Sequence, residues 1–183
     1  MTWSWVGLAD VKAQPWKNGG GVTRELLTLP QGSDWTVRIS VAEVARDGPF
    51  SSFAGVTRWF AVLAGAGVRL CVGADRHALT AQGAPLQFDG DAQSHCELID
   101  GATQDFNLMV RGRAARMVRV AGRIEKSVGA ATVVAAYAVS SCVICLGDEC
   151  VEVPAETLAW RTLDADAALS IEGDGALWME IAA

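Results

Sequence analysis

Alternation of apolar and polar residues at every second position is the sequence feature that most constrains this fold. The pattern runs through residues 35–42, 68–72, 105–110 and 176–181. Successive side chains of a β-strand point to opposite faces, so each run predicts a strand with one apolar and one polar face. Turn sequences rich in Gly and Asp separate the runs at short intervals. Many short strands with closely spaced turns predict an all-β sandwich or barrel.

An uncharged stretch at 127–147 permits two interpretations. Its length would suffice to span a bilayer. However, Ser140 and Ser141 interrupt it, and many of its residues are β-branched strand formers. We predict two buried strands joined at the serines, and a membrane span is the alternative.

Composition limits the classes of partner and compartment. Of the 183 residues 51% are apolar, which provides a core for one medium domain or two small, tightly fused ones. The net charge of −6 argues against nucleic acid as a partner, because phosphate contacts need clustered Lys and Arg. The N-terminus lacks a secretion-signal pattern, and the five cysteines are irregularly spaced. We therefore expect reduced thiols and a cytoplasmic protein.

Metal-ligating residues are sparse. The two histidines, His77 and His95, lie far apart in the sequence, so a three-histidine site is impossible. Cys142, Cys145 and Cys150 have a spacing similar to zinc or redox motifs. The residues between the first two are typical of a strand, which would place these two thiols on opposite faces. We expect buried thiols, no metal site and no cofactor.

A glycine triplet, Gly19–Gly21, follows Lys17 and Asn18. Consecutive glycines let backbone N–H groups converge on an anion, but they also form tight turns. The spacing does not fit a phosphate-binding P-loop. The strand predicted after the triplet, residues 22–29, carries Arg24 and Glu25, which should point to opposite faces unless a bulge intervenes.

Two further strands carry pairs of polar residues on one face. Arg38 and Ser40 share a face of the first, and Asp105 and Asn107 share a face of the second. Such polar faces either meet water or line a barrel interior, where Arg can bind a carboxylate. Periodicity leaves both alternatives open.

Three blocks, the segment PWKNGGGVTREL at 15–26 and residues 35–70 and 89–112, resemble the HutD/Ves family of bacterial proteins. The resemblance implies a cupin-like (bicupin) double β-barrel or jelly roll in one chain. The first half, 1–122, would carry the site, and the second, 123–183, would pack with it as one globular unit. Metal-binding cupins need a His-rich motif, and its absence from 47–76 is typical of a metal-free barrel.

The same resemblance implies a function. Genes of the HutD type accompany histidine-utilisation genes, and the implied role is non-catalytic regulation by sensing urocanate or a formylated glutamate derivative. The Ves branch is linked instead to a stress or cold response. One of the matched arginines would bind the carboxylate, with polar neighbours orienting it. The expected ligand-binding residues are Asn18, Arg24, Glu25, Arg38, Ser40, Arg58, Asp105 and Asn107.

Two other functions stay open. A metal-free cupin enzyme, an isomerase or hydrolase of a small polar metabolite, would use Asp105 or Glu25 as its general base. A protein-interaction module would instead expose Trp3, Trp5 and Trp16 as an aromatic patch, although tryptophans more often pack against the protein. The partner expected first is a small carboxylate metabolite, with no direct nucleic-acid or membrane contact, and a homodimer is left open.

Overall fold

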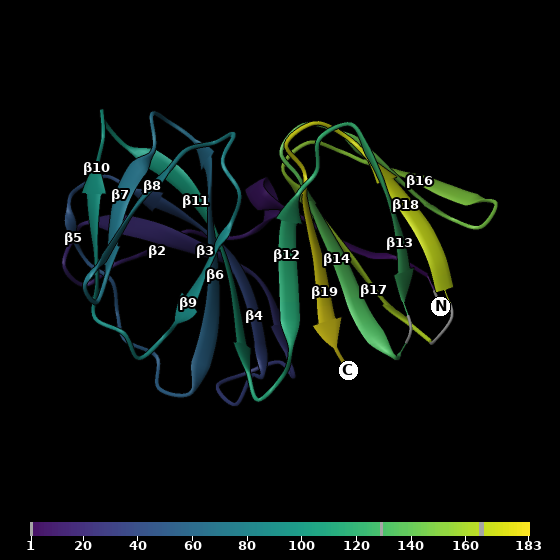
Figure 1. Ribbon diagram of the computed structural model, residues 1–183, viewed down its shortest axis with the longest axis horizontal. Coiled ribbons are helices and arrows are strands. Elements are labelled where there is room, and N and C mark those ends of the chain that lie inside the picture. The colour runs from purple at the N-terminus through teal and green to yellow at the C-terminus, as the bar shows by residue number, and fades with distance from the viewer. Residues whose placement is uncertain (1, 129, 165–166) are drawn as a thin grey trace. The chain divides into compact units, whose positions relative to one another are not determined.

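The computed structural model describes residues 2–128, 130–164 and 167–183 (Figure 1). Within them the secondary structure comprises nineteen β-strands and one 3-10 turn, η1 (Leu8–Asp10), without an α-helix. The all-β class predicted from the alternation is therefore confirmed. In the described part of the chain no helix is long and apolar enough to cross a membrane.

Two compact units divide the chain. The 11–112 unit is Val11–Gly112, and the 113–183 unit combines Arg113–Ala183 with the N-terminal residues up to Asp10. This division differs from the expected halves, 1–122 and 123–183. The chain crosses from one unit to the other ten residues earlier than the expected boundary after residue 122, and its N-terminal strand belongs with the later sequence.

Backbone pairing explains the difference. Strand β1 (Ser4–Gly7) pairs with β17 (Thr157–Leu163), so the N-terminus completes a sheet of the 113–183 unit. Strand β12 (Ala115–Arg119) pairs with β19 (Leu177–Ala182) in the same sheet. The expected boundary falls at the start of β13 (Arg123–Val128), a strand with alternating exposure that pairs with β18 (Ala167–Glu172).

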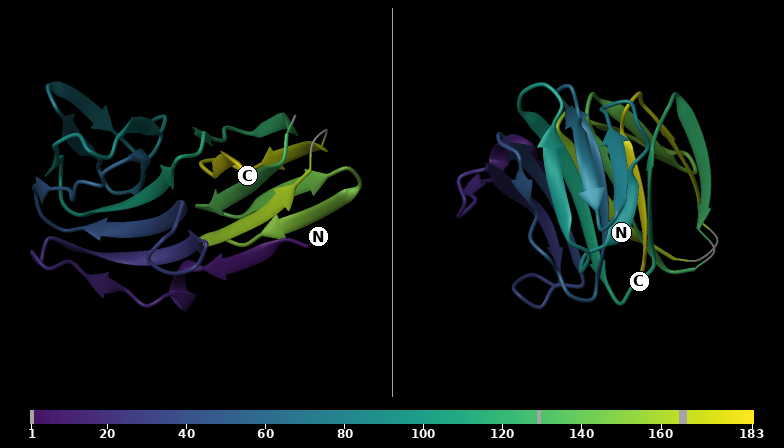
Figure 2. Two further views of the ribbon diagram at one scale, coloured as in Figure 1. Left: turned by 90° about the horizontal axis from the view of Figure 1, so that it is seen from below. Right: turned by 60° about the vertical axis from the view of Figure 1, so that its left-hand side comes forward.

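The 11–112 unit consists of two antiparallel sheets, and Figure 2 shows two strands of the larger one, β3 and β4, side by side. The six-stranded sheet has the order β2 (Gln14–Pro15), β3 (Gly21–Leu29), β4 (Val37–Val44), β11 (Thr103–Arg111), β6 (Val56–Ala64), β9 (Leu86–Asp89). The four-stranded sheet has the order β5 (Gly48–Pro49), β10 (Ser94–Leu98), β7 (Val68–Val72), β8 (Asp75–Leu79).

A shared apolar core joins these two sheets. Phe60 and Val62 of β6 pack in one buried cluster with Leu70 of β7 and Cys96 of β10. Each such side chain contributes about 1.5–3 kcal/mol when it is fully buried. The alternation is visible in β7, where Leu70 is fully buried and its neighbour Arg69 is exposed. The core therefore holds the two sheets together.

The 113–183 unit also contains two antiparallel sheets. One has the order β1, β17, β14 (Thr132–Ala138), β19, β12, and the other has the order β13, β18 (Ala167–Glu172), β15 (Cys142–Leu146), β16 (Glu149–Val153). Apolar residues of both sheets, including Ile144, Ile171 and Trp178, fill the interior of this unit. The uncharged stretch forms β14 and β15, so the prediction of two strands that meet at the serines is confirmed, but only β14 is buried along most of its length, because Val143 of β15 is 39% exposed.

The expectation of five reduced cysteines is wrong for two of them. Cys145 and Cys150 lie directly opposite each other in the β15–β16 hairpin, 4.1 Å apart at Cα, and form a disulfide. Cys71, Cys96 and Cys142 are free, and the last two are buried as small apolar residues. The spacing of the cysteines did not identify this pair, which the turn at Gly147 brings together. Within the described residues no three His, Cys, Asp or Glu side chains cluster as metal ligands.

Candidate functional site

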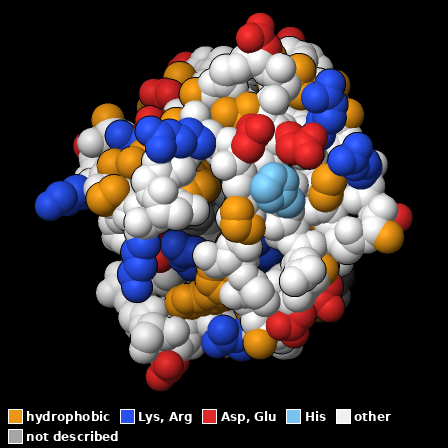
Figure 3. Space-filling view, turned by 90° about the vertical axis from the view of Figure 1, so that its left-hand side faces the viewer, with side chains coloured by type: hydrophobic (Ala, Val, Ile, Leu, Met, Phe, Trp, Pro, Cys, Tyr) orange, Lys and Arg blue, Asp and Glu red, His pale blue; other side chains and the backbone are white. Residues whose placement is uncertain are grey.

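A cavity of about 600 Å³ opens into the 11–112 unit. Its volume is within the usual range for small-molecule sites. One face of the six-stranded sheet forms its floor, and the segments Gln14–Asn18 and Pro49–Phe53 form its rim. Figure 3 shows the hollowed face, with Lys and Arg side chains and apolar side chains around the opening.

Strand register places the polar side chains of the floor in rows. Met109 of β11 lies between Arg38 of β4 and Arg58 of β6, and all three line the cavity. In the next row Asn107 lies between Ser40 and Phe60. Because residues two apart on a strand share a face, both rows point the same way. The sequence left open whether these polar residues meet water or line an interior. In the structure they line a cavity.

Arg58 is 4% exposed and has neutral hydrogen-bond partners. Its Nη2 donates to Oδ1 of Asn107 at 3.1 Å, and its Nη1 donates to the carbonyl oxygen of Ser51 at 3.3 Å. Three phenylalanine rings surround the guanidinium at 5.0–5.6 Å, from Phe50, Phe53 and Phe88. Burial, and after it the charge of Arg38, lowers the pKa of Arg58 to about 10, so it stays charged at neutral pH.

No carboxylate of the described chain balances that charge. Within residues 2–128, 130–164 and 167–183 Arg58 forms no ion pair, and its Nε is buried without a hydrogen-bond partner. A buried charge without a counter-ion is costly and normally acquires a partner. The guanidinium of Arg58 is therefore available to bind an anion that enters the cavity.

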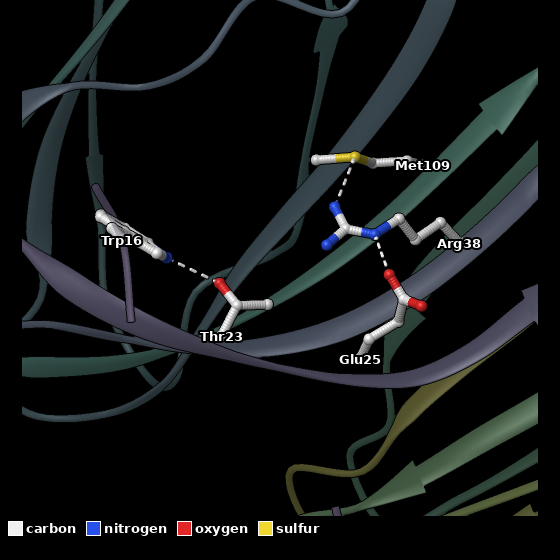
Figure 4. Close-up of polar contacts among 5 residues, drawn as sticks. All are labelled: Trp16, Thr23, Glu25, Arg38 and Met109. Atoms are coloured by element: carbon white, nitrogen blue, oxygen red, sulfur yellow. Dashed lines mark hydrogen bonds and ion pairs between the residues drawn. The ribbon is translucent and has the colours of Figure 1, made fainter. Parts of the chain in front are cut away.

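Arg38 has a partner from the neighbouring strand (Figure 4). Its Nε donates to Oε2 of Glu25 at 2.7 Å, and its Nη1 lies 3.8 Å from Sδ of Met109. The side chain of Arg38 is 20% exposed and that of Glu25 is 38% exposed. The hydrogen bond to Glu25 therefore fixes the orientation of the Arg38 guanidinium at the cavity.

A hairpin with an aromatic side chain covers one edge of the cavity. Nε1 of Trp16 donates to Oγ1 of Thr23 at 2.7 Å (Figure 4), and its ring meets Phe50 edge to face. Oδ1 of Asn18 accepts a hydrogen bond from the backbone N–H of Gly20 at 2.9 Å, which closes the turn. The glycine triplet is thus a turn leading into β3, the simpler of the two interpretations.

Asp105 lies deeper than the cavity. It is fully buried, and one oxygen accepts a hydrogen bond from Oγ1 of Thr103 at 2.8 Å, while Oδ1 has no partner in the described chain. Burial raises the pKa of Asp105 to about 7, although the bond from Thr103 opposes the shift. Burial and then the charge of Asp105 raise the pKa of the Cys96 thiol to about 12.

Five of the eight residues expected at the site line the cavity, and three do not. Those that line it are Asn18, Arg38, Ser40, Arg58 and Asn107. Asp105 and Glu25 are outside the lining, since Asp105 is fully buried in the core and Glu25, on the cavity face of β3, bonds to Arg38.

Arg24 lies away from the cavity, contrary to the prediction that it binds the ligand. It lies opposite Val41, on the other face of the sheet, and forms an ion pair with Glu43. The bulge that would have let Arg24 and Glu25 share a face falls after Glu25, so the two point apart.

Sequence reasoning missed much of the apolar and aromatic lining. Phe50, Phe53, Thr23 and Met109 line the cavity and are not among the residues expected there. Alternation could have identified Thr23, which shares a face with Glu25. The tryptophan patch is wrong as a set, because Trp3 is buried and Trp16 lines the cavity, whereas Trp5 is 43% exposed.

The lining combines positive charge with neutral polar groups. Among the described residues that form it, none is Asp, Glu, His or Cys. Lys17, Arg38 and Arg58 supply positive charge, and Ser40, Asn107 and Thr23 supply neutral polar groups. This combination recognises an anion through charge-assisted hydrogen bonds.

Known proteins resemble this chain in sequence. The HutD family model matches residues 8–183. Protein Ves from Cronobacter sakazakii is 41% identical over 120 residues, 62% of this chain and 66% of that protein. An uncharacterised 21.2 kDa protein in the hutC 3′ region of Pseudomonas putida is 38% identical over 104 residues, 55% of this chain and 54% of that protein. The matches thus span about half to two thirds of these relatives' own length.

Solved structures extend the likeness. HutD from Pseudomonas fluorescens SBW25, in a formate condition, has a TM-score of 0.85 at 30% identity, over 99% of this chain and 98% of that chain. A cupin 2 conserved barrel domain protein from Leptotrichia buccalis has a TM-score of 0.51 at 10% identity, over 97% and 94%. The second likeness concerns the fold alone, and it identifies that fold as cupin-like.

Proposed function

We propose that this chain, which belongs to the HutD family, binds a small carboxylate in the cavity of the 11–112 unit without converting it. The observation that carries the proposal is Arg58, a guanidinium that is 4% exposed, faces the cavity and has no carboxylate partner in the described chain. A carboxylate entering the cavity would supply the missing counter-charge and accept charge-assisted hydrogen bonds.

The surroundings of Arg58 support this assignment. Asn107 and the Ser51 carbonyl hold two of its nitrogens, so the guanidinium loses little freedom when the ligand binds. The phenylalanine rings exclude water from it, which strengthens its interaction with an anion. Ser40 and Thr23 offer hydroxyl groups that would orient the rest of the ligand.

The family suggests the source of the ligand. The Pseudomonas putida relative lies in a hutC 3′ region, and the Pseudomonas fluorescens relative is named HutD. We propose that the ligand is an intermediate of histidine utilisation, urocanate or a formylated glutamate derivative, and that its binding regulates that pathway in the cytoplasm. The two pairs of facing sheets and the cupin-like neighbour support a bicupin in which the 11–112 unit carries the site.

Catalysis is the weaker alternative. Two residues were considered as general bases. Asp105 is buried outside the cavity, and Glu25 is bonded to Arg38. A base must reach the proton that it removes, and neither side chain lines the cavity.

Thermal unfolding with urocanate, N-formylglutamate and histidine tests the proposal. A ligand at 100 times its dissociation constant adds about 2.7 kcal/mol to the free energy of unfolding. We expect a rise in melting temperature with one of the first two compounds. Arg58→Met, which removes the charge and keeps most of the side-chain volume, should fold and abolish the rise. Arg24→Met is the matched control, because Arg24 lies on the other face of the sheet.

Two results would contradict the proposal. One is the absence of a shift with any of the three compounds at millimolar concentration. The other is a change in the mass of urocanate or N-formylglutamate after incubation, which would indicate an enzyme. A shift that persists unchanged in Arg58→Met would remove Arg58 from the site.

A further inference from the structure

We infer that Cys145 and Cys150 form a thiol–disulfide exchange site, at which a dithiol reductant opens the bond and releases the tip of the β15–β16 hairpin. The hairpin tip is residues 145–150, the two cysteines and the turn between them. The site lies in the 113–183 unit, so the inference is independent of the cavity and of its ligand.

The disulfide is accessible to a reductant in solution. Cys150 is exposed and Cys145 is partly exposed, because both stand on the outer face of their sheet. Their inward-facing neighbours Ile144 and Val153 are fully buried. Exposed disulfides exchange with thiols more readily than buried ones, since exchange requires a thiolate to reach one of the sulfurs. The exposed Sγ of Cys150 is therefore the atom that a reductant would attack.

The bond fastens the end of an edge strand. Strand β16 is the last strand of its sheet, and its described pairing is with β15. At the base of the hairpin Val153 lies opposite Cys142, and both are buried in the core. At the tip Leu146 is only partly buried, and Glu149, whose side chain is 53% exposed, pairs with Arg161 at 3.1 Å. Such a partly exposed ion pair contributes little, so opening the disulfide leaves the tip weakly held.

An equivalent hairpin without the bond is present in the 11–112 unit. Strands β7 and β8 repeat the burial pattern of β15 and β16 residue by residue, with Gly73 in the place of Gly147. Cys71 takes the place of Cys145, but the residue opposite it is Arg76. That hairpin is paired in full register, and β8 is likewise an edge strand. A covalent bond is therefore not needed for such a hairpin to fold, and reduction should leave the unit native outside the tip.

The third cysteine of the 113–183 unit does not compete for the exchange. Cys142 points into the core, and burial raises the pKa of its thiol to about 11, so the thiol stays protonated at neutral pH. The reducing electrons must therefore come from outside the unit.

The exchange consists of two displacements. A thiolate of the dithiol attacks Sγ of Cys150 and forms a mixed disulfide, and the sulfur of Cys145 leaves as a thiolate and takes up a proton. The second thiolate of the dithiol then attacks the reductant's sulfur in the mixed disulfide and displaces Cys150, which is protonated in turn. The cysteine pair gains two electrons and two protons, and the dithiol becomes a disulfide. The reverse reaction closes the bond.

Hydrogen exchange of the native protein, followed by mass spectrometry, tests the inference. Millimolar dithiothreitol should open the bond without denaturant, so that alkylation detects two more thiols than before. Amide exchange at 146–150 should become about tenfold faster, because the tip opens locally. The equivalent tip, residues 72–75, should keep its rate, and oxidised dithiothreitol should restore the slow rate at 146–150.

Two variants provide matched comparisons. The double variant Cys145→Ser with Cys150→Ser should show the fast rate at 146–150 with or without dithiothreitol. Arg76→Cys places a thiol opposite Cys71 in the equivalent hairpin. Exchange at 72–75 should then respond to dithiothreitol as 146–150 does in the wild-type protein.

Three results would overturn the inference. The first is a bond that dithiothreitol reduces in urea but not in the native protein. The second is an exchange rate at 146–150 that stays the same when the bond opens. The third is faster exchange throughout β14 as well, which would show that reduction unfolds the unit rather than the tip. A failure to bind carboxylates would contradict the proposed function and leave this inference standing.

Discussion

Nη2 of Arg58 donates a hydrogen bond to Oδ1 of Asn107 at 3.1 Å, diagonally across the neighbouring strands β6 and β11. The acceptor is a neutral amide, so the bond orients the guanidinium without balancing its charge. An Asp at the same position would do both. The choice of amide over carboxylate is what leaves Arg58 available to a ligand.

Asn107→Asp should therefore stabilise the protein and abolish ligand binding. The new carboxylate would pair with Arg58 inside the unit, and we expect a gain of about 1–3 kcal/mol in the free energy of unfolding. Urea unfolding measures the gain, and calorimetry with the ligand of the wild-type protein measures the loss. Asn107→Leu removes the acceptor and supplies no charge, so it should destabilise. If Asn107→Asp still binds carboxylates with wild-type affinity, Arg58 is not their site.

Asp105 should make the protein less stable as the pH rises. Burial raises its pKa in the folded protein to about 7, above the value of about 3.9 of an unfolded chain. Between these two values the folded state binds more protons than the unfolded state, so stability falls with rising pH and levels off above about pH 7. Between pH 5 and pH 8 the loss due to Asp105 should be about 2–3 kcal/mol.

Urea unfolding of Asp105→Asn at both pH values measures this contribution. The variant keeps a partner for Thr103 and cannot ionise, so it should lose less stability than the wild-type protein between pH 5 and pH 8. Asp75→Asn, at an exposed position of β8, is the control and should follow the wild-type curve. Parallel curves for the wild-type protein and Asp105→Asn would show that the buried carboxyl does not titrate in this range.

The glycines of the rim hairpin should differ in their tolerance of alanine. A Cβ at Gly21 would overlap the carbonyl oxygen of Glu43 on the neighbouring strand, so Gly21→Ala must move backbone and should cost more than about 2 kcal/mol. Gly19 has open space around it but a φ of +68°, for which alanine costs about 1–2 kcal/mol. Urea unfolding of both variants ranks them, and a smaller loss for Gly21→Ala than for Gly19→Ala would contradict the packing of β3 on β4.

The disulfide predicts how many cysteine thiols are free to react. In denaturant without reductant, three of the five cysteines should react with Ellman's reagent, and all five should react after reduction. The bond closes a loop of few residues, so Cys145→Ser with Cys150→Ser should cost about 2 kcal/mol. Five reactive thiols in unreduced protein, purified under air, would contradict the pairing.

Local sequence predicted the strands well because alternation is a local property. Each strand records on its own residues which face is buried, as Leu70 and Arg69 do in β7. The same rule predicted that Arg38 and Ser40 share a face, and that Asp105 and Asn107 do. It could not tell a polar face that meets water from one that lines a cavity, because that depends on the second sheet.

What the sequence by itself determined is therefore the all-β class, the two strands of the uncharged stretch and, through three matched blocks, the family. Tertiary structure alone decided that Arg38 and Arg58 flank Met109, that Asp105 lies in the core, and that Arg24 faces away from the cavity. It also assigned the N-terminal strand to the later unit and joined Cys145 to Cys150. The physical reason is that pairing register and sheet packing connect residues far apart in sequence, and local patterns hold no record of those partners.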